Sequence, residues 1–178
     1  MSQKPTCKLL ITLSPILWSQ LAAILTCQVM KSLEGTSALA AGRRPPLLPE
    51  DFSNILQSRN FTGRGDKEKV KELYKKIFLT IAASAAELDF NSLGWGDEEA
   101  ADLAKVLPSF RKVTYVFLGG NKIGDAGAAA IAAALPGSMV ESLLLGSNCI
   151  GYAGAASLAE ILLQTKHWFI QKTIRLCL

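Results

Sequence analysis

Histidine and cysteine are scarce in this 178-residue sequence, and their scarcity limits the chemistry that the protein can perform. His167 is the only histidine and no nucleophile motif stands near it, so we expect no hydrolytic triad. The four cysteines (7, 27, 149 and 177) form no CxxC pair, whereas a zinc site needs about four nearby ligands. We therefore predict no metal, no catalytic residue and no enzymatic activity, and we expect Cys149 to be a small buried apolar residue.

The sequence also lacks the loops that bind nucleotides. Residues 118–138 read LGGNKIGDAGAAAIAAALPGS, in which an apolar run leads into a glycine-rich turn and a helical pattern. Many phosphate sites begin in this order. However, a Walker loop requires a lysine where Asp125 stands, and a carboxylate repels phosphate. No GxGxxG occurs either, so we expect no cofactor.

No block of like charge is long enough to indicate a nucleic-acid partner. Residues 1–82 hold 12 Lys/Arg against 6 Asp/Glu, whereas residues 83–165 hold 4 against 9. The length allows one domain with a core and an N-terminal extension, and the many alanines indicate a core of closely packed small side chains.

Residues 1–41 have the character of a hydrophobic targeting or anchor segment. No charge occurs between Lys8 and Lys31, and residues 9–30 are just long enough to cross a bilayer, which takes about 20 residues. A secretory signal or membrane anchor, an organellar transit peptide, and a helix packed on the domain all agree with this pattern. The first two place the protein in the secretory route, a membrane or an organelle, and the third leaves it in the cytoplasm.

A proline-rich linker is expected over residues 42–64, because consecutive prolines disfavour helix. A glycosylation sequon begins at Asn60 within it and has meaning only in the secretory route. Residues 65–84 are expected to form a capping helix with Asp66 as N-cap and the lysines on its solvated face. One apolar stripe follows helical spacing there, made of Val70, Leu73, Tyr74, Ile77 and Ile81.

A repeat dominates residues 85–165. Gly96, Gly124 and Gly151 are 28 and 27 residues apart, and a fixed period of this size indicates a stacked architecture. In each copy a short apolar strand pattern precedes the glycine and a helical pattern follows it. We expect Asp97 and Asp125 to cap the helices that they begin, and the third helix to be less well capped because Tyr152 replaces the aspartate. The apolar helix positions are Ala100, Leu103, Ala104 and Leu107, then Ala128, Ile131, Ala132 and Leu135, then Ala155, Leu158, Ala159 and Leu162.

The units LxLxxNxI followed by GDxGAxx[IL]A resemble leucine-rich repeats of the ribonuclease-inhibitor type, which are also found in Ran GTPase-activating protein and NOD-like receptors. The resemblance implies a short curved α/β solenoid of about three strand–turn–helix units, with parallel strands on the concave side and helices on the convex side. It also implies that Asn121 and Asn148 satisfy backbone groups in the turns between repeats. The first copy has Leu93 at the asparagine position, as suits a repeat next to a cap. We expect residues 166–178 to be a degenerate or truncated end, in which 174–178 could begin a fourth strand.

Alternation along the strands predicts the residues on the concave face. We expect Glu87, Tyr115 and Ser142 in one row and Asp89, Phe117 and Leu144 in the next, with 91, 119 and 146 in a third. An exposed apolar patch of this kind marks contact with a protein or membrane, unless the N-terminal segment covers it. We predict a non-catalytic module that binds a partner protein through this face. The alternatives are a small-GTPase regulator, by family analogy, and a scaffold tethered to a membrane through residues 9–30.

Overall fold

The computed structural model describes residues 44–59, 65–164 and 173–175. The predictions about residues 9–30, the sequon at Asn60, His167 and three of the cysteines lie outside this part of the chain. Within it, no helix is both long enough and apolar enough to span a bilayer.

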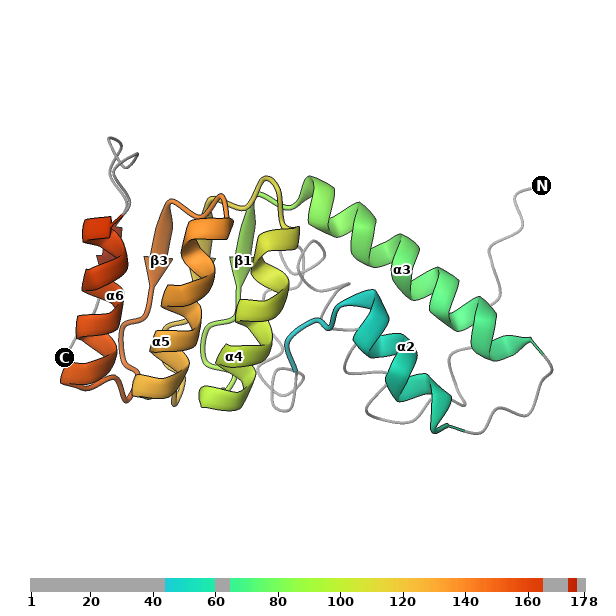
Figure 1. Ribbon diagram of the computed structural model, residues 1–178, viewed down its shortest axis with the longest axis horizontal. Helices are drawn as coiled ribbons and strands as arrows, with labels where there is room; N and C mark the ends of the chain where they lie inside the picture. The colour runs from blue at the N-terminus through green and yellow to red at the C-terminus, as the bar shows by residue number, and fades with distance from the viewer. Residues whose placement is uncertain (1–43, 60–64, 165–172, 176–178) are drawn as a thin grey trace.

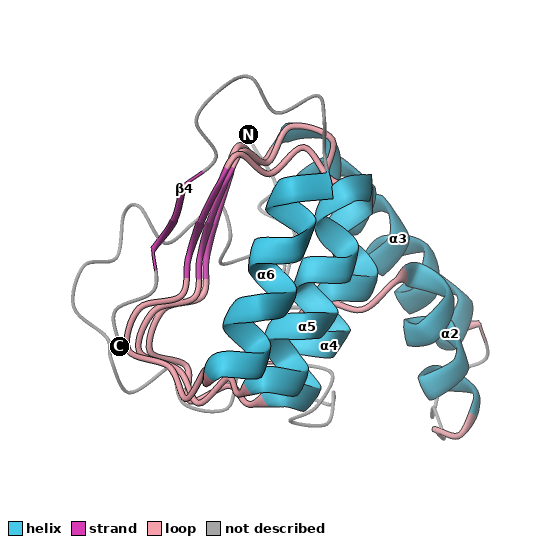
Figure 2. Cartoon of the chain, turned by 60° about the vertical axis from the view of Figure 1, so that its left-hand side comes forward, coloured by secondary structure: helices cyan, strands magenta, loops and turns pink. Residues whose placement is uncertain are grey.

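The predicted short α/β leucine-rich-repeat solenoid is confirmed (Figure 1). A parallel sheet in the order β1-β2-β3-β4 forms one layer, and the helices that follow the first three strands stand side by side in the other (Figure 2). Two single-turn 3-10 helices, η4 and η5, follow the first two repeat helices. The bounds are β1 Glu87–Asp89, α4 Asp97–Val106, η4 Leu107–Ser109, β2 Tyr115–Phe117, α5 Asp125–Ala134, η5 Leu135–Gly137, β3 Ser142–Leu144, α6 Tyr152–Gln164 and β4 Thr173–Arg175.

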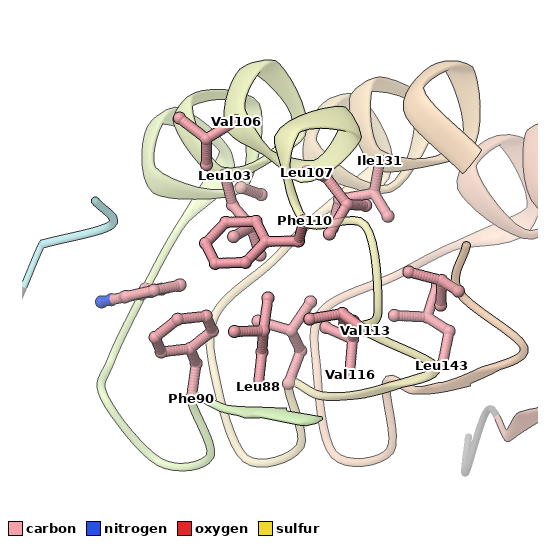
Figure 3. Close-up of a cluster of buried hydrophobic side chains, with 14 of the residues drawn as sticks. Leu88, Phe90, Leu103, Val106, Leu107, Phe110, Val113, Val116, Ile131 and Leu143 are labelled. Atoms are coloured by element: carbon pink, nitrogen blue, oxygen red, sulfur yellow. The ribbon is translucent and has the colours of Figure 1, made fainter. Parts of the chain in front are cut away.

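The core lies between these two layers. Leu88, Val116 and Leu143 point from the strands toward Leu103 and Ile131 on the helices (Figure 3), and all five are almost fully buried. The next residue on each of these strands points to the opposite face, as the alternation predicts. These residues are Asp89, Phe117 and Leu144.

The repeated apolar helix face is buried in the first two copies but not throughout the third. Ala104 and Ala132 are 8% and 2% exposed, whereas the corresponding Ala159 of α6 is classed as exposed. The difference arises because α4 and α5 are each covered by the next helix of the row, whereas α6 stands at its end (Figure 1).

The proline-rich segment is more ordered than we predicted, because residues 42–64 contain a helix, α2, at Pro49–Gln57. Pro49 stands in the first turn, where a missing N–H costs nothing and the fixed φ suits a helix. Phe52 and Leu56 on α2 are buried. Prolines therefore place the start of this helix rather than preventing it.

The predicted helix at 65–84 is α3, Asp66–Ser84, with two corrections. Its N-cap is Gly65, at φ 84°, and Asp66 is the first helical residue, with no side-chain cap at this end. Leu73 is 49% exposed instead of buried, and Phe78 takes the buried place on the stripe. α2 covers only one side of α3, and the apolar pattern along α3 does not by itself show which side this is.

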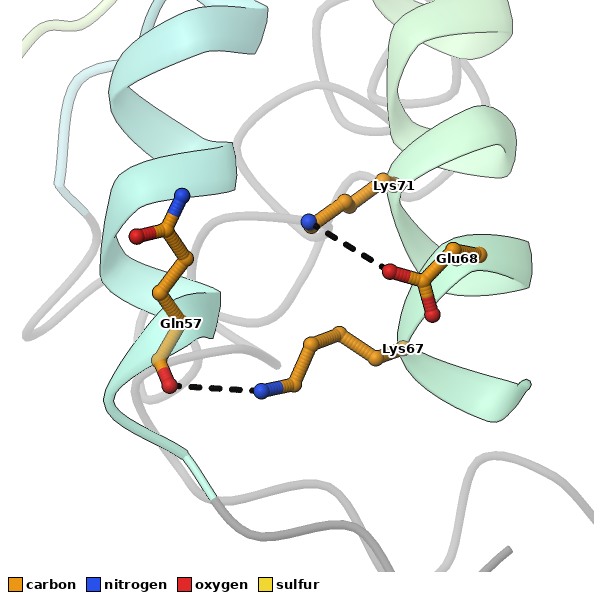
Figure 4. Close-up of polar contacts among 4 residues, drawn as sticks. All are labelled: Gln57, Lys67, Glu68 and Lys71. Atoms are coloured by element: carbon orange, nitrogen blue, oxygen red, sulfur yellow. Dashed lines mark hydrogen bonds and ion pairs between the residues drawn. The ribbon is translucent and has the colours of Figure 1, made fainter. Parts of the chain in front are cut away.

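Polar contacts join α2 to α3 at both ends of α2. The Tyr74 hydroxyl donates to the carbonyl of Leu47 at 2.8 Å and accepts from its N–H at 3.0 Å. The Lys67 ammonium donates to the carbonyl of Gln57 at 3.2 Å, while Lys71 pairs with Glu68 on α3 itself (Figure 4). Lys67 is therefore more than part of a solvated face.

α3 joins the first repeat at its C-terminal end. The ring of Phe78 lies 6.0 Å from that of Phe110, and the Arg111 N–H donates to the Ala82 carbonyl at 3.2 Å. That α3 caps the open edge of the repeats stays a prediction.

Candidate protein-binding face and its repeat scaffold

The six residues predicted for partner binding lie in two rows across three neighbouring strands. Parallel pairing aligns Glu87 with Tyr115 and Tyr115 with Ser142. Two residues further along, it aligns Asp89 with Phe117 and Phe117 with Leu144. We call these six residues the concave face. They share a face because side chains alternate along each strand and the register is in step.

An aromatic pair occupies the middle strand of this face. The rings of Tyr115 and Phe117 stack at 6.4 Å between centroids with an interplanar angle of 14°. Tyr115 is 48% exposed, and Phe117 and Leu144 are half-buried. The Glu87 and Asp89 carboxylates belong to the strand beside the pair, so the face is acidic on the β1 side, whereas β3 contributes the polar Ser142 and the apolar Leu144.

Asn121 ties the first two repeats together from inside the turn. Its Oδ1 accepts from the N–H groups of Leu93 and Trp95 at 2.9 and 3.1 Å. Its Nδ2 donates to the carbonyls of Phe90 and Leu118 at 2.8 and 2.9 Å. Asn121 is 5% exposed, and these four bonds satisfy backbone groups that water cannot reach.

Asn148 makes the corresponding connection between the second and third repeats. Its Nδ2 donates to the carbonyls of Leu118 and Leu145, and its Oδ1 accepts from the Ile123 N–H at 3.0 Å. Its side chain is half-buried, so water can reach part of this turn. The two amides hold successive turns in step, and the strands that lead into those turns carry the concave face.

The repeat aspartates do not cap the helices that they begin, which corrects our prediction. Asp97 Oδ1 accepts from the N–H groups of Gly124 and Gly127, at 2.7 and 2.9 Å, at the start of α5 in the next repeat. Asp125 Oδ1 does the same for Gly151 and Gly154 at the start of α6, at 2.7 and 2.9 Å. Each aspartate therefore joins one repeat to the next.

The expectation that α6 is poorly capped because of Tyr152 is consequently wrong. Asp125, on the preceding repeat, caps α6 through two N–H groups. What Tyr152 lacks is a carboxylate to offer to a helix on its other side, since Tyr152 stands at the position equivalent to Asp97 and Asp125.

A glycine in each of α5 and α6 makes room for this bridge. A Cβ at Gly127 would lie 2.7 Å from Asp97 Oδ1, and one at Gly154 would lie 2.7 Å from Asp125 Oδ1. The first helix has no aspartate before it and carries Glu99 at this position, whose Oε2 accepts from its own Gly96 N–H at 2.9 Å. The aligned Glu99, Gly127 and Gly154 are the sequence signal for cross-repeat capping, because the glycine occurs only where an aspartate precedes it by one repeat.

Two glycines in the turn after β2 have separate explanations, a close approach between neighbouring turns for Gly119 and a left-handed backbone for Gly120. Asn91 Oδ1 accepts from the Gly119 N–H at 2.6 Å, and a Cβ at Gly119 would lie 3.1 Å from that oxygen. Gly120 has φ 69°, and the corresponding Ser92 and Ser147 have φ 55° and 58°, so this turn position is left-handed in every repeat.

Cys149 is exposed and forms no disulfide, which corrects the prediction that it is a buried apolar residue. Its N–H donates to the Ile123 carbonyl at 2.8 Å, and the side chain points away from the core. Among the residues described, no group of three His, Cys, Asp or Glu residues could hold a metal ion.

A comparison with protein-family models finds two leucine-rich repeats, at residues 111–132 and 138–159. The first match covers β2 and most of α5, and the second covers β3 and most of α6. No curated protein matches the chain. The matches support a leucine-rich-repeat protein, and repeats of this kind generally mediate protein–protein interaction without being enzymes.

Proposed function

We propose that this chain is a non-catalytic module that binds a partner protein through its concave face. The observation that carries the proposal is the stacked Tyr115–Phe117 pair, which leaves an aromatic surface open to solvent on an inner strand of the sheet. Aromatic side chains supply large contact areas at a small entropic cost and are enriched among the residues that dominate binding energies.

The charges on the face suggest the chemistry of the partner. Glu87 and Asp89 lie on the strand next to Tyr115 and Phe117, so a basic side chain could pair with a carboxylate and stack on a ring at once. Leu144 extends the apolar surface on the other side of Phe117. A segment that carries an arginine or lysine next to an apolar residue would match both features.

The experiment is an affinity purification from cells with the full chain, quantified by mass spectrometry. Phe117→Asp should lower recovery of the bound protein by at least about 10-fold, because it places a charge at the centre of the apolar surface. Tyr115→Ala should lower the recovery as well, and Asp89→Lys should weaken the binding of a basic partner. Met139→Asp is the matched control, since Met139 is 59% exposed and lies outside the concave face.

Unchanged recovery with Phe117→Asp and an intact circular dichroism spectrum would refute binding through the concave face. The same result is expected if the N-terminal segment covers the face. In that case Phe117→Asp should instead lower the stability of the full chain relative to Met139→Asp.

We also assign the repeats to the ribonuclease-inhibitor type. The support is the step of 28 and 27 residues, an α-helix in each repeat, and the turn asparagines. Small-GTPase regulation stays a prediction that rests on this analogy alone. A membrane-tethered scaffold stays a prediction that rests on residues 9–30, outside the described part of the chain.

A further inference from the structure

The outer face of α6 at the end of the helix row is apolar and uncovered among the residues described (Figure 1). Tyr152 and Leu163 are 91% and 83% exposed, which makes them the two most exposed large apolar side chains of that part of the chain. Ala156 and Ala159 are exposed between them. At about 100° per residue, the four positions fall within about 60° of the helix surface. We call them the α6 stripe.

The repeat itself shows that this face is built for helix packing. The position of Ala159 corresponds to Ala104 on α4 and Ala132 on α5, which are 8% and 2% exposed because the next helix packs on them. Small side chains at this position allow two helices to approach closely. On the core side of α6, Leu158 is only 1% exposed. The α6 stripe has no neighbouring helix in the described part of the chain.

A further repeat on the α6 stripe would lack the cross-repeat cap that α5 and α6 receive. In the first two repeats the residue equivalent to Tyr152 is an aspartate, and this aspartate caps the next helix by accepting from two of its N–H groups. Tyr152 stands there on α6 and offers no carboxylate. A helix that packs on α6 must therefore have its N-terminus capped from elsewhere.

A second copy of α6 meets this requirement. Its first turn is capped by Asp125 of its own chain, at 2.7 and 2.9 Å, so it needs no acceptor from across the interface. The stripe also has the same spacing from either end, since its steps are four, three and four residues. Two antiparallel copies related by a twofold axis would place Tyr152 against Leu163 and Ala156 against Ala159. The small pair lets the backbones approach, and the large pairs close both ends.

We propose that the α6 stripe is a self-association surface, through which two copies of this chain pair by antiparallel packing of their α6 helices. A twofold interface uses one patch twice, and the self-complementary stripe is such a patch. The stripe contains no charged residue, and the one charged residue of α6, the exposed Glu160, lies about 40° outside the stripe around the helix. The concave face lies on the sheet layer, opposite the helices, so both copies keep it open (Figure 2). The proposal does not depend on the proposed function.

Sedimentation velocity of the full chain tests the pairing, over concentrations from about 1 to 300 μM, which cover the affinity expected of a small interface. A reversible dimer is expected. Leu163→Asp should raise its Kd at least about 10-fold, because it buries a charge against Tyr152 of the other copy. Leu79→Asp on α3 is the matched control, since Leu79 is also an exposed leucine, 53% accessible, and it should leave the Kd unchanged.

Three results would overturn the proposal. The first is a monomer at every concentration, as expected if another part of the chain covers the stripe. The second is a dimer that Leu163→Asp does not weaken, as expected if the N-terminal segment drives association. The third is a dimer that Leu79→Asp weakens equally. Circular dichroism of each variant separates these results from a loss of fold.

Disulfide trapping tests the antiparallel direction, in a full chain whose four native cysteines are replaced by serine. A mixture of Ala156→Cys and Ala159→Cys chains should form mainly the mixed disulfide under mild oxidation. If each variant instead forms mainly its own symmetric disulfide and the mixed species is the minor product, the helices pack in parallel and the proposed arrangement is wrong.

Discussion

Asp97 gives the sharpest test of how the repeats hold together, because its carboxylate serves a helix in the next repeat. Asp97→Ala removes the acceptor for the Gly124 and Gly127 N–H groups, which lie 2.7 and 2.9 Å from Oδ1. Loss of an N-cap acceptor costs about 1 kcal/mol and up to about 2 kcal/mol. The same carboxylate lies in the first turn of α4, where a negative charge contributes about 0.3 to 1 kcal/mol. We expect the free energy of unfolding to fall by about 2 kcal/mol.

Asp102→Ala is the matched control, because Asp102 is also an aspartate of α4. Asp102 forms an exposed ion pair with Lys105 at 2.8 Å, three residues away. Such pairs contribute about 0.3 to 0.5 kcal/mol, and alanine recovers a similar amount through its better helix propensity. The control should therefore leave the free energy of unfolding nearly unchanged. Asp97→Asn, which keeps an oxygen acceptor, should fall between the two.

Two measurements check this prediction. Urea unfolding followed by circular dichroism gives the stability of each variant. Hydrogen exchange of individual amides gives the direction of the contact, since Asp97→Ala should accelerate exchange at Gly124 and Gly127 and leave Gly151 and Gly154 protected. Equal stability of the Asp97→Ala and Asp102→Ala variants would refute cross-repeat capping. So would faster exchange confined to the first turn of α4.

Two further predictions concern the turns and the N-terminal helices. Asn121→Ala should lower the free energy of unfolding by about 3 kcal/mol, because it removes the side-chain hydrogen bonds to four backbone groups around a buried site, of which the Leu118 carbonyl keeps its bond from Asn148. Asn148→Ala should cost less because that site is half-buried. Equal urea midpoints for the two variants would contradict this prediction. Burial raises the pKa of the Tyr74 hydroxyl above its usual value, so the folded state holds this proton more tightly than the unfolded state. The resulting stability is fully present below the unfolded pKa of about 10 and is lost as pH rises beyond it, so wild-type protein should lose more stability than Tyr74→Phe between about pH 9 and 11. Parallel loss in both proteins would show that Tyr74 ionisation does not contribute.

The repeat could be predicted because its signals are local. The period at Gly96, Gly124 and Gly151 indicates stacked units, and the alternation within each strand separates Leu88 from Asp89 as core and face. The pairing of rows on the concave face then follows, since parallel strands in units of nearly equal length come into register.

The wrong predictions about the repeat aspartates and about the flanks of α3 share one physical cause, which is that a side chain's neighbour can come from another part of the chain. An aspartate directly after a glycine has the same local pattern whether it caps its own helix or the next one. The distance between repeats decides, and it places Asp97 Oδ1 within reach of Gly124 and Gly127. Leu73 is left exposed and Phe78 is buried because α2 and the first repeat lie along particular flanks of α3.

By itself, then, the sequence determined α3 and the elements of the three repeats, their order and which side of the first three strands is buried, because these depend on periodicities of 2 and 3.6 residues along one segment. Only the tertiary structure decided which repeat each aspartate serves, that Cys149 is exposed, and that α6 presents Tyr152 and Leu163 to solvent. These properties depend on what stands beside a segment in space, and neighbours in space are set by packing between segments rather than by spacing within one.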